Sequence, residues 1–328
     1  MKIQKNISVL PYNTFGLDVK ARVVAEYDSV EELIELLKRY QGQSLLPVGE
    51  GSNLLFTKDY DGVLLISRMR RARAMKEDAQ QVWIEAESGL KLDDLIAQLV
   101  DMNLTGMENL SYIPGTVGAS AVQNVGAYGV EAKDVIESVE TIEIATLMPK
   151  VFTNAACCFG YRDSVFKNEL KGQYIVTKVV YRLHKDGPLL LDRVKTNPMP
   201  TTAQEVRDAV IDIRRNKLPE VGETGSAGSF FKNPVIDVKQ FTSLKEQYPD
   251  MPCYEEEKGI KVPAAWLIEQ CGWKGKKMGG AQVYEKQPLV IVNADHATAA
   301  DIVALAAAVV DSVYKQFGIM ISPEVNYI

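Results

Sequence analysis

The most informative stretch of this 328-residue chain is IPGTVGAS at residues 113–120, continued by QNVGAYG at residues 123–129. Its small residues leave the backbone open to whatever lies against it. A second such loop, GEGSN at residues 49–53, follows the strand-like run LLPV. Two glycine-rich loops suit an extended, two-ended cofactor better than a mononucleotide. Close packing of loops on a sheet explains the same composition and stays open as the alternative.

The loop at residues 49–53 begins like a dinucleotide fingerprint but does not complete one. Leu54 stands where the third glycine belongs, and a strand-like run follows instead of a helix. Its glycines and serine still offer the closely spaced backbone N–H groups that a pyrophosphate requires. A plain turn and a phosphate cradle therefore remain equal interpretations of this loop.

Composition excludes several classes of protein. Hydrophobic residues make up 46% of the chain and charged residues 24%, and the formal net charge is −6. This balance argues against a nucleic-acid surface. The longest apolar run has nine residues, at 302–310, against the ~20 of a membrane span. The N-terminus has no signal-peptide core. We expect a cytoplasmic protein without a nucleic-acid or membrane partner.

Cysteine and histidine are too sparse for a metal centre or a histidine-based hydrolase. The chain has four cysteines without a CxxC pair and two histidines, His184 and His296. A zinc site and a Ser-His-Asp triad are both disfavoured. We expect no metal and four reduced thiols.

Periodicity predicts an α+β chain without regular βαβ alternation. Ser29 and Glu32 form a predicted capping box for the first helix. Helices are expected at 30–40, 91–102, 203–216, 263–271 and 299–317, and strands at 45–48, 62–66, 82–86, 138–145, 173–183 and 289–293. The segments 113–129 and 225–229 are expected to be loops.

The segment GSAGSFFKNP at residues 225–234 is the most unusual. Ser229 and Lys232 match the SxxK pattern of serine acyl-transfer enzymes, but the SDN and KTG partners are absent. A serine among small residues could equally be a positioned proton donor. A polar loop anchored by its two phenylalanines is the structural alternative. Arg162 and Glu324 become candidates only if the fold brings them to Ser229.

Motifs along nearly the whole chain resemble one family, the UDP-N-acetylenolpyruvoylglucosamine reductases. They occur in the family's order and span more than 300 residues. The motifs are NTFG at 13–16, GEGSN at 49–53, IPGTVGASAVQNVGAYGVE at 113–131, FGYRDSVFK at 159–167, RRNKLP at 214–219, GSAGSFFKNP at 225–234, WLIEQCGWKG at 266–275 with GGA at 279–281, and PEV at 323–325.

The resemblance implies an FAD-binding fold of the vanillyl-alcohol-oxidase type, in which two lobes bind FAD without a covalent link, followed by an α+β substrate-binding domain. The expected boundaries are 1–68 and 69–200 for the two lobes and 201–328 for the third domain, whose C-terminal tail returns to the active site. By resemblance, the FAD contacts are Gly49, Glu50, Gly51, Ser52, Asn53, Ile113, Pro114, Gly115, Thr116, Gly118 and Ala119.

The implied reaction belongs to peptidoglycan precursor synthesis. NADPH reduces the flavin, and the enolpyruvyl ether of UDP-N-acetylglucosamine is then reduced to the lactyl ether of UDP-N-acetylmuramate. Hydride passes from flavin N5 to C3, and a proton is added at C2. By resemblance, Arg162 and Glu324 polarise the carboxylate and Ser229 donates the proton. The implied substrate contacts are Tyr128, Arg214, Lys217, Asn233, Lys274 and Gln287.

Two positions depart from the family pattern. Asn326 stands where some members carry an arginine, and the stretch GPLLLD at 187–192 lacks the loop tyrosine that closes over the diphosphate in one subclass. We expect a monomer acting on this small-molecule substrate. The alternatives are another flavin oxidoreductase of the same cofactor fold, and a sugar-nucleotide-binding protein without flavin.

Overall fold

The computed structural model describes residues 1–256 and 258–328. Its contacts divide the chain into two compact units, each built from separate stretches of sequence. The first unit comprises Met1–Ser8, Lys20–Glu50 and Tyr60–Arg214, and the second comprises Val9–Val19, Gly51–Asp59 and Arg215–Ile328.

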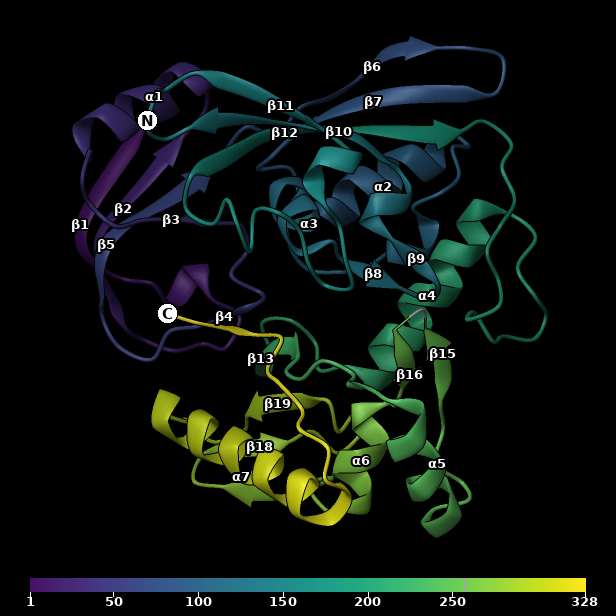
Figure 1. The fold of residues 1–328 in the computed structure, drawn as a ribbon. Coiled ribbons are helices and arrows are strands. Elements are labelled where there is room, and N and C mark those ends of the chain that lie inside the picture. Colours follow the sequence, from purple (N-terminus) through teal and green to yellow (C-terminus); the bar gives the residue numbers. More distant parts are fainter. Residues whose placement is uncertain (257) are drawn as a thin grey trace. The chain divides into compact units, whose positions relative to one another are not determined.

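The first unit opens with a four-stranded sheet in the order β1-β2-β5-β3. β2, β5 and β3 run parallel, and β1 is antiparallel to β2. One helix, α1, packs its buried leucines against this sheet (Figure 1). The bounds are β1 (Lys2–Ser8), β2 (Lys20–Tyr27), β3 (Leu45–Val48), β5 (Tyr60–Ser67) and α1 (Val30–Arg39).

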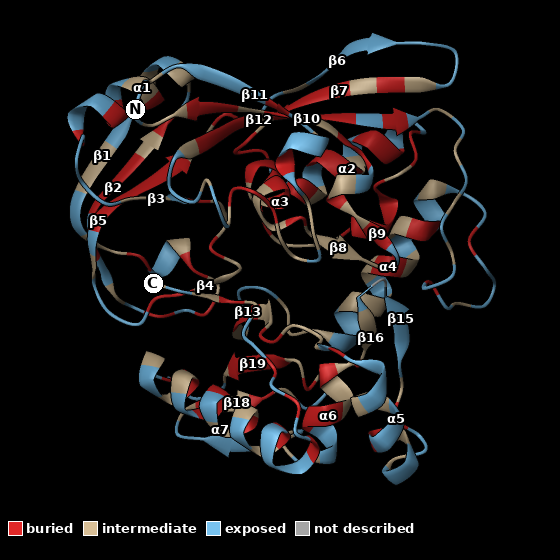
Figure 2. Ribbon diagram, in the orientation of Figure 1, coloured by how far each residue is buried: buried red, intermediate tan, exposed pale blue. Residues whose placement is uncertain are grey.

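A second, five-stranded antiparallel sheet follows in the same unit, in the order β11-β10-β12-β7-β6. Its central strands are largely buried (Figure 2), and α2 and α3 contribute to the core beside them. The bounds are β6 (Ala72–Glu77), β7 (Gln81–Glu87), α2 (Leu92–Asp101), α3 (Val117–Gln123), β8 (Gly126–Ala127), β9 (Val130–Glu131), β10 (Ile136–Glu143), β11 (Pro149–Thr153), β12 (Tyr174–His184) and α4 (Ala203–Lys217), which ends past the unit boundary.

The second unit combines a four-stranded sheet, β13-β19-β18-β17, with a three-stranded one, β14-β16-β15. α7 is its longest helix and forms one core with α6 and the larger sheet. The bounds are β13 (Gly225–Ser229), β14 (Val235–Ile236), α5 (Val238–Gln247), β15 (Tyr254–Glu256), β16 (Gly259–Lys261), α6 (Ala264–Gln270), β17 (Lys277–Met278), β18 (Ala281–Val283), β19 (Val290–Asn293) and α7 (Ala299–Phe317).

A parallel pair of short strands links distant parts of the second unit. β4 (Leu54–Leu55) pairs with β20 (Asn326–Tyr327), so the last residues lie beside residues near position 55 (Figure 1). The Thr57 N–H donates to the carbonyl oxygen of Ile328 at 2.9 Å. The C-terminal tail is thereby fixed along this strand.

All the predicted helices and strands form, with ends within a few residues of those expected. The first capping box is only half formed: Ser29 accepts the Glu32 N–H, but the Glu32 carboxylate accepts the N–H of Asp28 instead of that of Ser29. Among the residues that the structure describes, no helix combines the length and apolar content needed to cross a membrane.

Two expected loops are wrong in part. Residues 117–123 of the glycine-rich stretch form α3, because its small side chains allow a tight helical turn against β7. Residues 225–229 form strand β13, because ladder pairing with β19 satisfies the backbone that a loop would leave exposed.

Candidate active site

In the first unit, the two glycine-rich loops meet through Glu50. Its carboxylate accepts the Gly115 N–H at 2.7 Å and pairs with the Lys91 ammonium at 2.8 Å. The hydrogen bond and charge of Glu50 raise the pKa of Lys91. A Cβ added to Gly49 would lie 2.7 Å from Thr116 Oγ1, so only glycine permits this approach. The loops 49–50 and 113–119 therefore form one continuous surface.

This surface fits a flavin pyrophosphate. A Cβ on Gly118 would lie 2.9 Å from Ser88 Cβ, so α3 begins directly against β7. Thr116 is nearly buried, yet its N–H donates to no described residue. An orphaned N–H beside backbone free of bulky side chains is what an anionic group accepts. Ile113, Pro114 and Ala119 complete the segment expected to hold FAD.

The rest of the GEGSN loop belongs to the second unit. Gly51 has φ +67°, and a Cβ there would overlap the carbonyl of Tyr12, so glycine is required. The Asn53 carbonyl accepts both the backbone N–H and the side-chain amide of Asn326, at 3.0 and 3.3 Å. Asn326 thus binds this loop. Ser52 lies between the two anchored residues.

Arg162 lies in the first unit in a left-handed backbone conformation, with φ +55°. Its guanidinium donates to the carbonyl oxygen of Gly126, where any side chain would collide with it. The Lys167 ammonium donates to the Arg162 carbonyl at 2.9 Å and to Gln123 Oε1 at 2.8 Å. A side chain fixed at both its head and its backbone is typical of a functional position.

Tyr128 also has a left-handed backbone, with φ +48°. The fully buried Asn109 donates one amide hydrogen to the Tyr128 carbonyl at 2.9 Å and the other to the Leu190 carbonyl at 2.8 Å. This amide joins Tyr128 to the segment that follows β12. The Tyr128 ring packs on a small apolar cluster that includes Val194 and Val210.

Two expected substrate residues, Tyr128 and Arg214, and the expected catalytic residue Arg162 influence one another electrostatically in the first unit. Burial lowers the pKa of Arg214. The charges of Tyr128 and Asp93 partly offset this lowering, and the charge of Arg162 adds to it. Burial raises the pKa of Tyr128, against the influence of Arg214. Two guanidinium groups beside a phenol form a local basic site in an acidic chain, suited to an anion.

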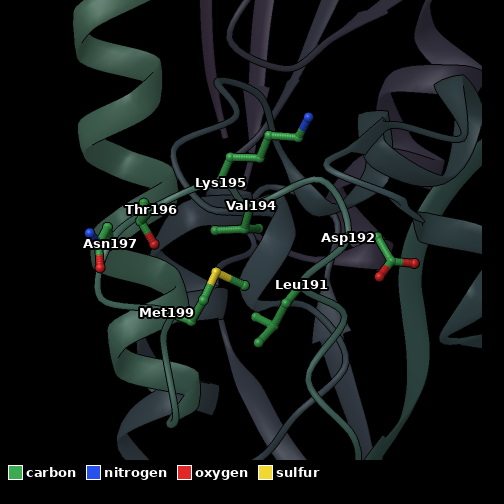
Figure 3. Close-up of a pocket in the computed structure, with 7 residues that line it drawn as sticks. All are labelled: Leu191, Asp192, Val194, Lys195, Thr196, Asn197 and Met199. Carbon is green, nitrogen blue, oxygen red and sulfur yellow. The ribbon is translucent and has the colours of Figure 1, made fainter.

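The segment after β12 forms a cavity of about 520 Å³, shown in Figure 3. Leu191, Val194 and Met199 point toward one another, and the charged ends of Asp192 and Lys195 point away. Val194 is fully buried beside the same cluster that holds Tyr128. The stretch at residues 187–192, which contains no tyrosine, is thus anchored by apolar packing.

In the second unit, Ser229 ends strand β13 at an irregular pairing. Ser226 pairs with Val292 and Ser229 with Val290, so one extra residue bulges from β13 between them. Gly228 takes φ +66° inside this bulge. Bulges re-aim a side chain, which suits a functional serine. No hydrogen bond joins the half-buried Ser229 to Lys232 among the described residues, so the acyl-transfer interpretation gains no support.

Glu324 lies on the chain segment next to Ser229. Its N–H donates to the Phe230 carbonyl at 2.7 Å, and Lys232 N–H donates to the Ser322 carbonyl at 2.9 Å. Phe231 and Pro323 form a bridge between these hydrogen bonds. Phe230 is fully buried, so its side chain anchors the pair of segments. The fold therefore brings two of the three expected catalytic residues together.

The remaining expected substrate residues have mainly local partners. Asn233 Oδ1 accepts the N–H of Ala264 at the start of α6, at 2.9 Å. Lys274 pairs with Glu269 at 2.7 Å on an exposed surface. Gln287 closes the turn before β19 through its carbonyl. Lys217 is the last residue of α4.

Sequence reasoning missed Asn109, Asp93 and Lys167. Each acts on a candidate site residue through backbone groups, and such contacts have no signature in residue type or spacing. Their signals in the sequence were weak. Asn109 lies in the triplet ENL, Asp93 is an acid in the first turn of a helix, and Lys167 ends the motif FGYRDSVFK. Among the described residues, no three metal-ligating side chains cluster.

Two family models match the chain. An FAD binding domain matches residues 21–146, and the UDP-N-acetylenolpyruvoylglucosamine reductase C-terminal domain matches residues 220–328. The chain is 44% identical to that reductase from Flavobacterium johnsoniae, over 100% of both chains. It is 45% identical to the Bacteroides fragilis reductase, over 99% of this chain and 100% of the relative.

A solved structure has the same fold. The UDP-N-acetylenolpyruvylglucosamine reductase of Thermus caldophilus matches with a TM-score of 0.70 and 23% identity, covering 100% of this chain and 99% of that one. The glycine-lined surface and the matched FAD domain define an FAD-dependent oxidoreductase with an α+β fold. With identities above 40% along its full length, the chain belongs to the UDP-N-acetylenolpyruvoylglucosamine reductase family, which serves peptidoglycan precursor synthesis.

Proposed function

We propose that this protein uses NADPH to reduce the enolpyruvyl ether of UDP-N-acetylglucosamine to the lactyl ether, giving UDP-N-acetylmuramate. The observation that carries the proposal is the pairing of the Ser229 and Glu324 segments through Phe230 and Pro323. This backbone pairing makes the segments of Ser229 and Glu324 neighbours in the chain fold, which supports a shared role for a weak acid and a carboxylate in the second half of this reaction. The full-length identity to named reductases supports the same substrate.

FAD, when bound, supplies the hydride from N5 that adds to C3 of the enolpyruvyl group. In this proposal Gly49 and Glu50, with residues 113–119, hold its pyrophosphate, and Gly51, Ser52 and Asn53 of the same loop are the further proposed contacts. The required close approach of backbone at Gly49 and the orphaned Thr116 N–H support this assignment.

Ser229 donates the proton to C2. A serine hydroxyl is a weak acid, so it protonates only a strongly basic carbon in a site that excludes water. Arg162 and Glu324 act on the substrate carboxylate, where negative charge collects after addition at C3. The fixed guanidinium of Arg162, held through Gly126 and Lys167, suits that role because it needs no reorganisation.

Tyr128 and Arg214 bind the phosphates or the sugar, together with Lys217, Asn233, Lys274 and Gln287. We assign the substrate mainly to residues 201–328 and the cofactor to the lobes 1–68 and 69–200, and Tyr128 of the second lobe is the proposed exception. Arg214 is half-buried and feels the positive charge of Arg162, and this concentration of positive charge supports an anionic ligand.

The test is NADPH oxidation by the flavin-loaded enzyme with and without the enolpyruvyl sugar nucleotide. We expect sustained oxidation only with the sugar nucleotide, and one UDP-N-acetylmuramate formed per NADPH consumed. Sustained oxidation supported by oxygen alone would instead indicate a flavin oxidase. A colourless preparation without flavin absorption would indicate a binding protein.

A further inference from the structure

Asp93, in the first turn of α2, binds two partners in the first unit. Its Oδ1 accepts the N–H of Tyr112 at 2.6 Å. The carboxylate also forms a bidentate ion pair with the Arg207 guanidinium, in which Oδ2 lies 3.0 Å from Nη2. Bidentate pairs of this type are directional as well as strong. The carboxylate therefore fixes the position of the Tyr112 backbone relative to α4.

Tyr112 links this carboxylate to Arg214. It has φ +61°, a left-handed conformation that is strained for a residue with a bulky side chain. Its carbonyl oxygen accepts the Arg214 Nε–H at 3.0 Å. The Asp93 hydrogen bond to the Tyr112 N–H supports the strained conformation, and that conformation directs the carbonyl at Arg214.

Arg207 and Arg214 lie seven residues apart on α4, which is two helical turns on one face. Asp93 pairs with the first arginine directly and reaches the second through Tyr112. One carboxylate therefore sets both the placement of this helix face and the orientation of the arginine two turns further along it.

The Arg214 guanidinium is left with capacity for a ligand. Nε is its only nitrogen with a hydrogen-bond partner among the described residues, although the side chain is half-buried. Partly desolvated guanidinium nitrogens that no protein group occupies are well suited to bind an anion. The negative charge of Asp93 also favours the protonated form of Arg214.

We propose that Asp93 is a positioning residue that orients Arg214 for the anionic part of the substrate through the strained carbonyl of Tyr112. The inference rests on the proposed function, because it assumes that Arg214 binds the sugar nucleotide. Asp93 itself contacts no substrate. Its removal changes the affinity for the sugar nucleotide and leaves the flavin chemistry intact.

The experiment compares Asp93→Ala, Asp93→Asn and the matched control Asp94→Asn in the flavin-loaded enzyme. Asp94 occupies the same helical turn and is exposed, so its variant removes an equal charge near the helix N-terminus without touching Tyr112 or Arg207. For each variant we measure kcat and KM for the enolpyruvyl sugar nucleotide, the rate of flavin reduction by NADPH, and UDP binding by the change in flavin absorption.

We expect Asp93→Ala to raise KM for the sugar nucleotide and the Kd for UDP by about tenfold, with kcat and flavin reduction within about twofold of wild type. Asp93→Asn keeps an oxygen acceptor for the Tyr112 N–H but loses the charge that pairs with Arg207. It should therefore raise this KM and this Kd by only about threefold. Asp94→Asn should match wild type. If Asp93→Ala yields no folded protein, the Asp93→Asn comparison with Asp94→Asn decides the question.

An unchanged KM and UDP affinity in both Asp93 variants would overturn the inference. Equal losses in kcat and flavin reduction would also overturn it, since they would mean general structural damage. Failure of the proposed function is a different result: in that case the wild-type enzyme itself does not turn over the enolpyruvyl sugar nucleotide.

Discussion

The N–H of Glu324 donates a 2.7 Å hydrogen bond to the carbonyl oxygen of Phe230, the residue that follows Ser229. Residues almost a hundred positions apart are thus neighbours by direct backbone contact. Because Phe230 and Phe231 are both buried, neither segment can shift without disturbing the core. The relative placement of Ser229 and Glu324 is consequently set by the fold of the second unit.

Replacing Ser229 tests its role as the proton donor. Ser229→Ala should leave flavin reduction by NADPH near normal and slow product formation by ~10²–10⁴-fold, the usual worth of a positioned general acid. Ser229→Cys should retain part of the activity, because a thiol also donates a proton. Stopped-flow traces of both half-reactions measure this, and equal slowing of the two would identify Ser229 as structural.

Arg162 and Glu324 should act as a unit on the substrate carboxylate. Arg162→Ala and Glu324→Ala should each reduce turnover strongly and spare flavin reduction by NADPH. The double variant should lose little more than the worse single variant, because residues that act together are non-additive. Steady-state kcat of the three variants tests this, and multiplicative losses would contradict a shared role.

Asn109 should support Tyr128. Asn109→Leu keeps the branched shape of the side chain but leaves the carbonyls of Tyr128 and Leu190 without donors, which should lower the free energy of unfolding by about 1–3 kcal/mol. Urea unfolding measures the loss. Because Asn109 holds the Tyr128 backbone, the variant should also have a raised KM for the sugar nucleotide. Wild-type stability and KM in this variant would show that the two hydrogen bonds are dispensable.

The Asp93 carboxylate should make stability depend on acid pH. Burial by itself would raise the pKa of Asp93, but the hydrogen bonds of Arg207 and Tyr112 and the charges of Arg207 and Arg214 hold it below its ordinary value. A carboxyl with a depressed pKa in the folded state stabilises the fold above its unfolded pKa, about 4, and loses this contribution as the pH falls further.

The corresponding measurement is urea unfolding at pH 5 and pH 3. Wild type should lose more stability over this interval than Asp93→Asn, which has no carboxyl to protonate. Asp94→Asn should follow wild type. Identical losses in Asp93→Asn and wild type would mean that the pKa of Asp93 is not lowered by folding.

Flavin should be released intact on denaturation. Covalent attachment requires a positioned His, Cys or Tyr, and neither histidine lies in the glycine-rich segments. Burial raises the pKa of Cys157 to about 12, which makes its thiol a poor nucleophile. Acid precipitation should leave all the yellow colour in the supernatant, and colour retained in the pellet would contradict this.

Local sequence signals predicted five of the seven α-helices and six of the twenty strands in the described residues, because these signals depend on neighbours in the chain. Thr298 caps α7 and Gly318 ends it in a left-handed conformation, and both residue types favour these positions. The helix α5 was not predicted, although Asp237 caps it. Its only buried residue is Leu244, so its apolar face is too narrow to give a clear periodicity.

The candidate site was less predictable than the helices. Motif resemblance named Arg162, Tyr128 and Arg214, but nothing in their spacing indicated that Asn109 and Asp93 would hold two of them. Those contacts depend on left-handed backbone at Tyr112 and Tyr128, which tyrosine rarely adopts and no propensity favours. Long-range packing imposes these conformations, so only the folded chain reveals them.

The pairing of β20 with β4 has a consequence for synthesis on the ribosome. Leu54 and Leu55 emerge early, but their strand partner at Asn326 and Tyr327 is among the last residues translated. Residues 9–19 and 51–59 must therefore wait through most of translation for their C-terminal partners before the second unit can close. During that interval the nascent chain exposes Phe15 and Leu55, both fully buried once folded, which makes it a natural client for chaperones that shield apolar segments.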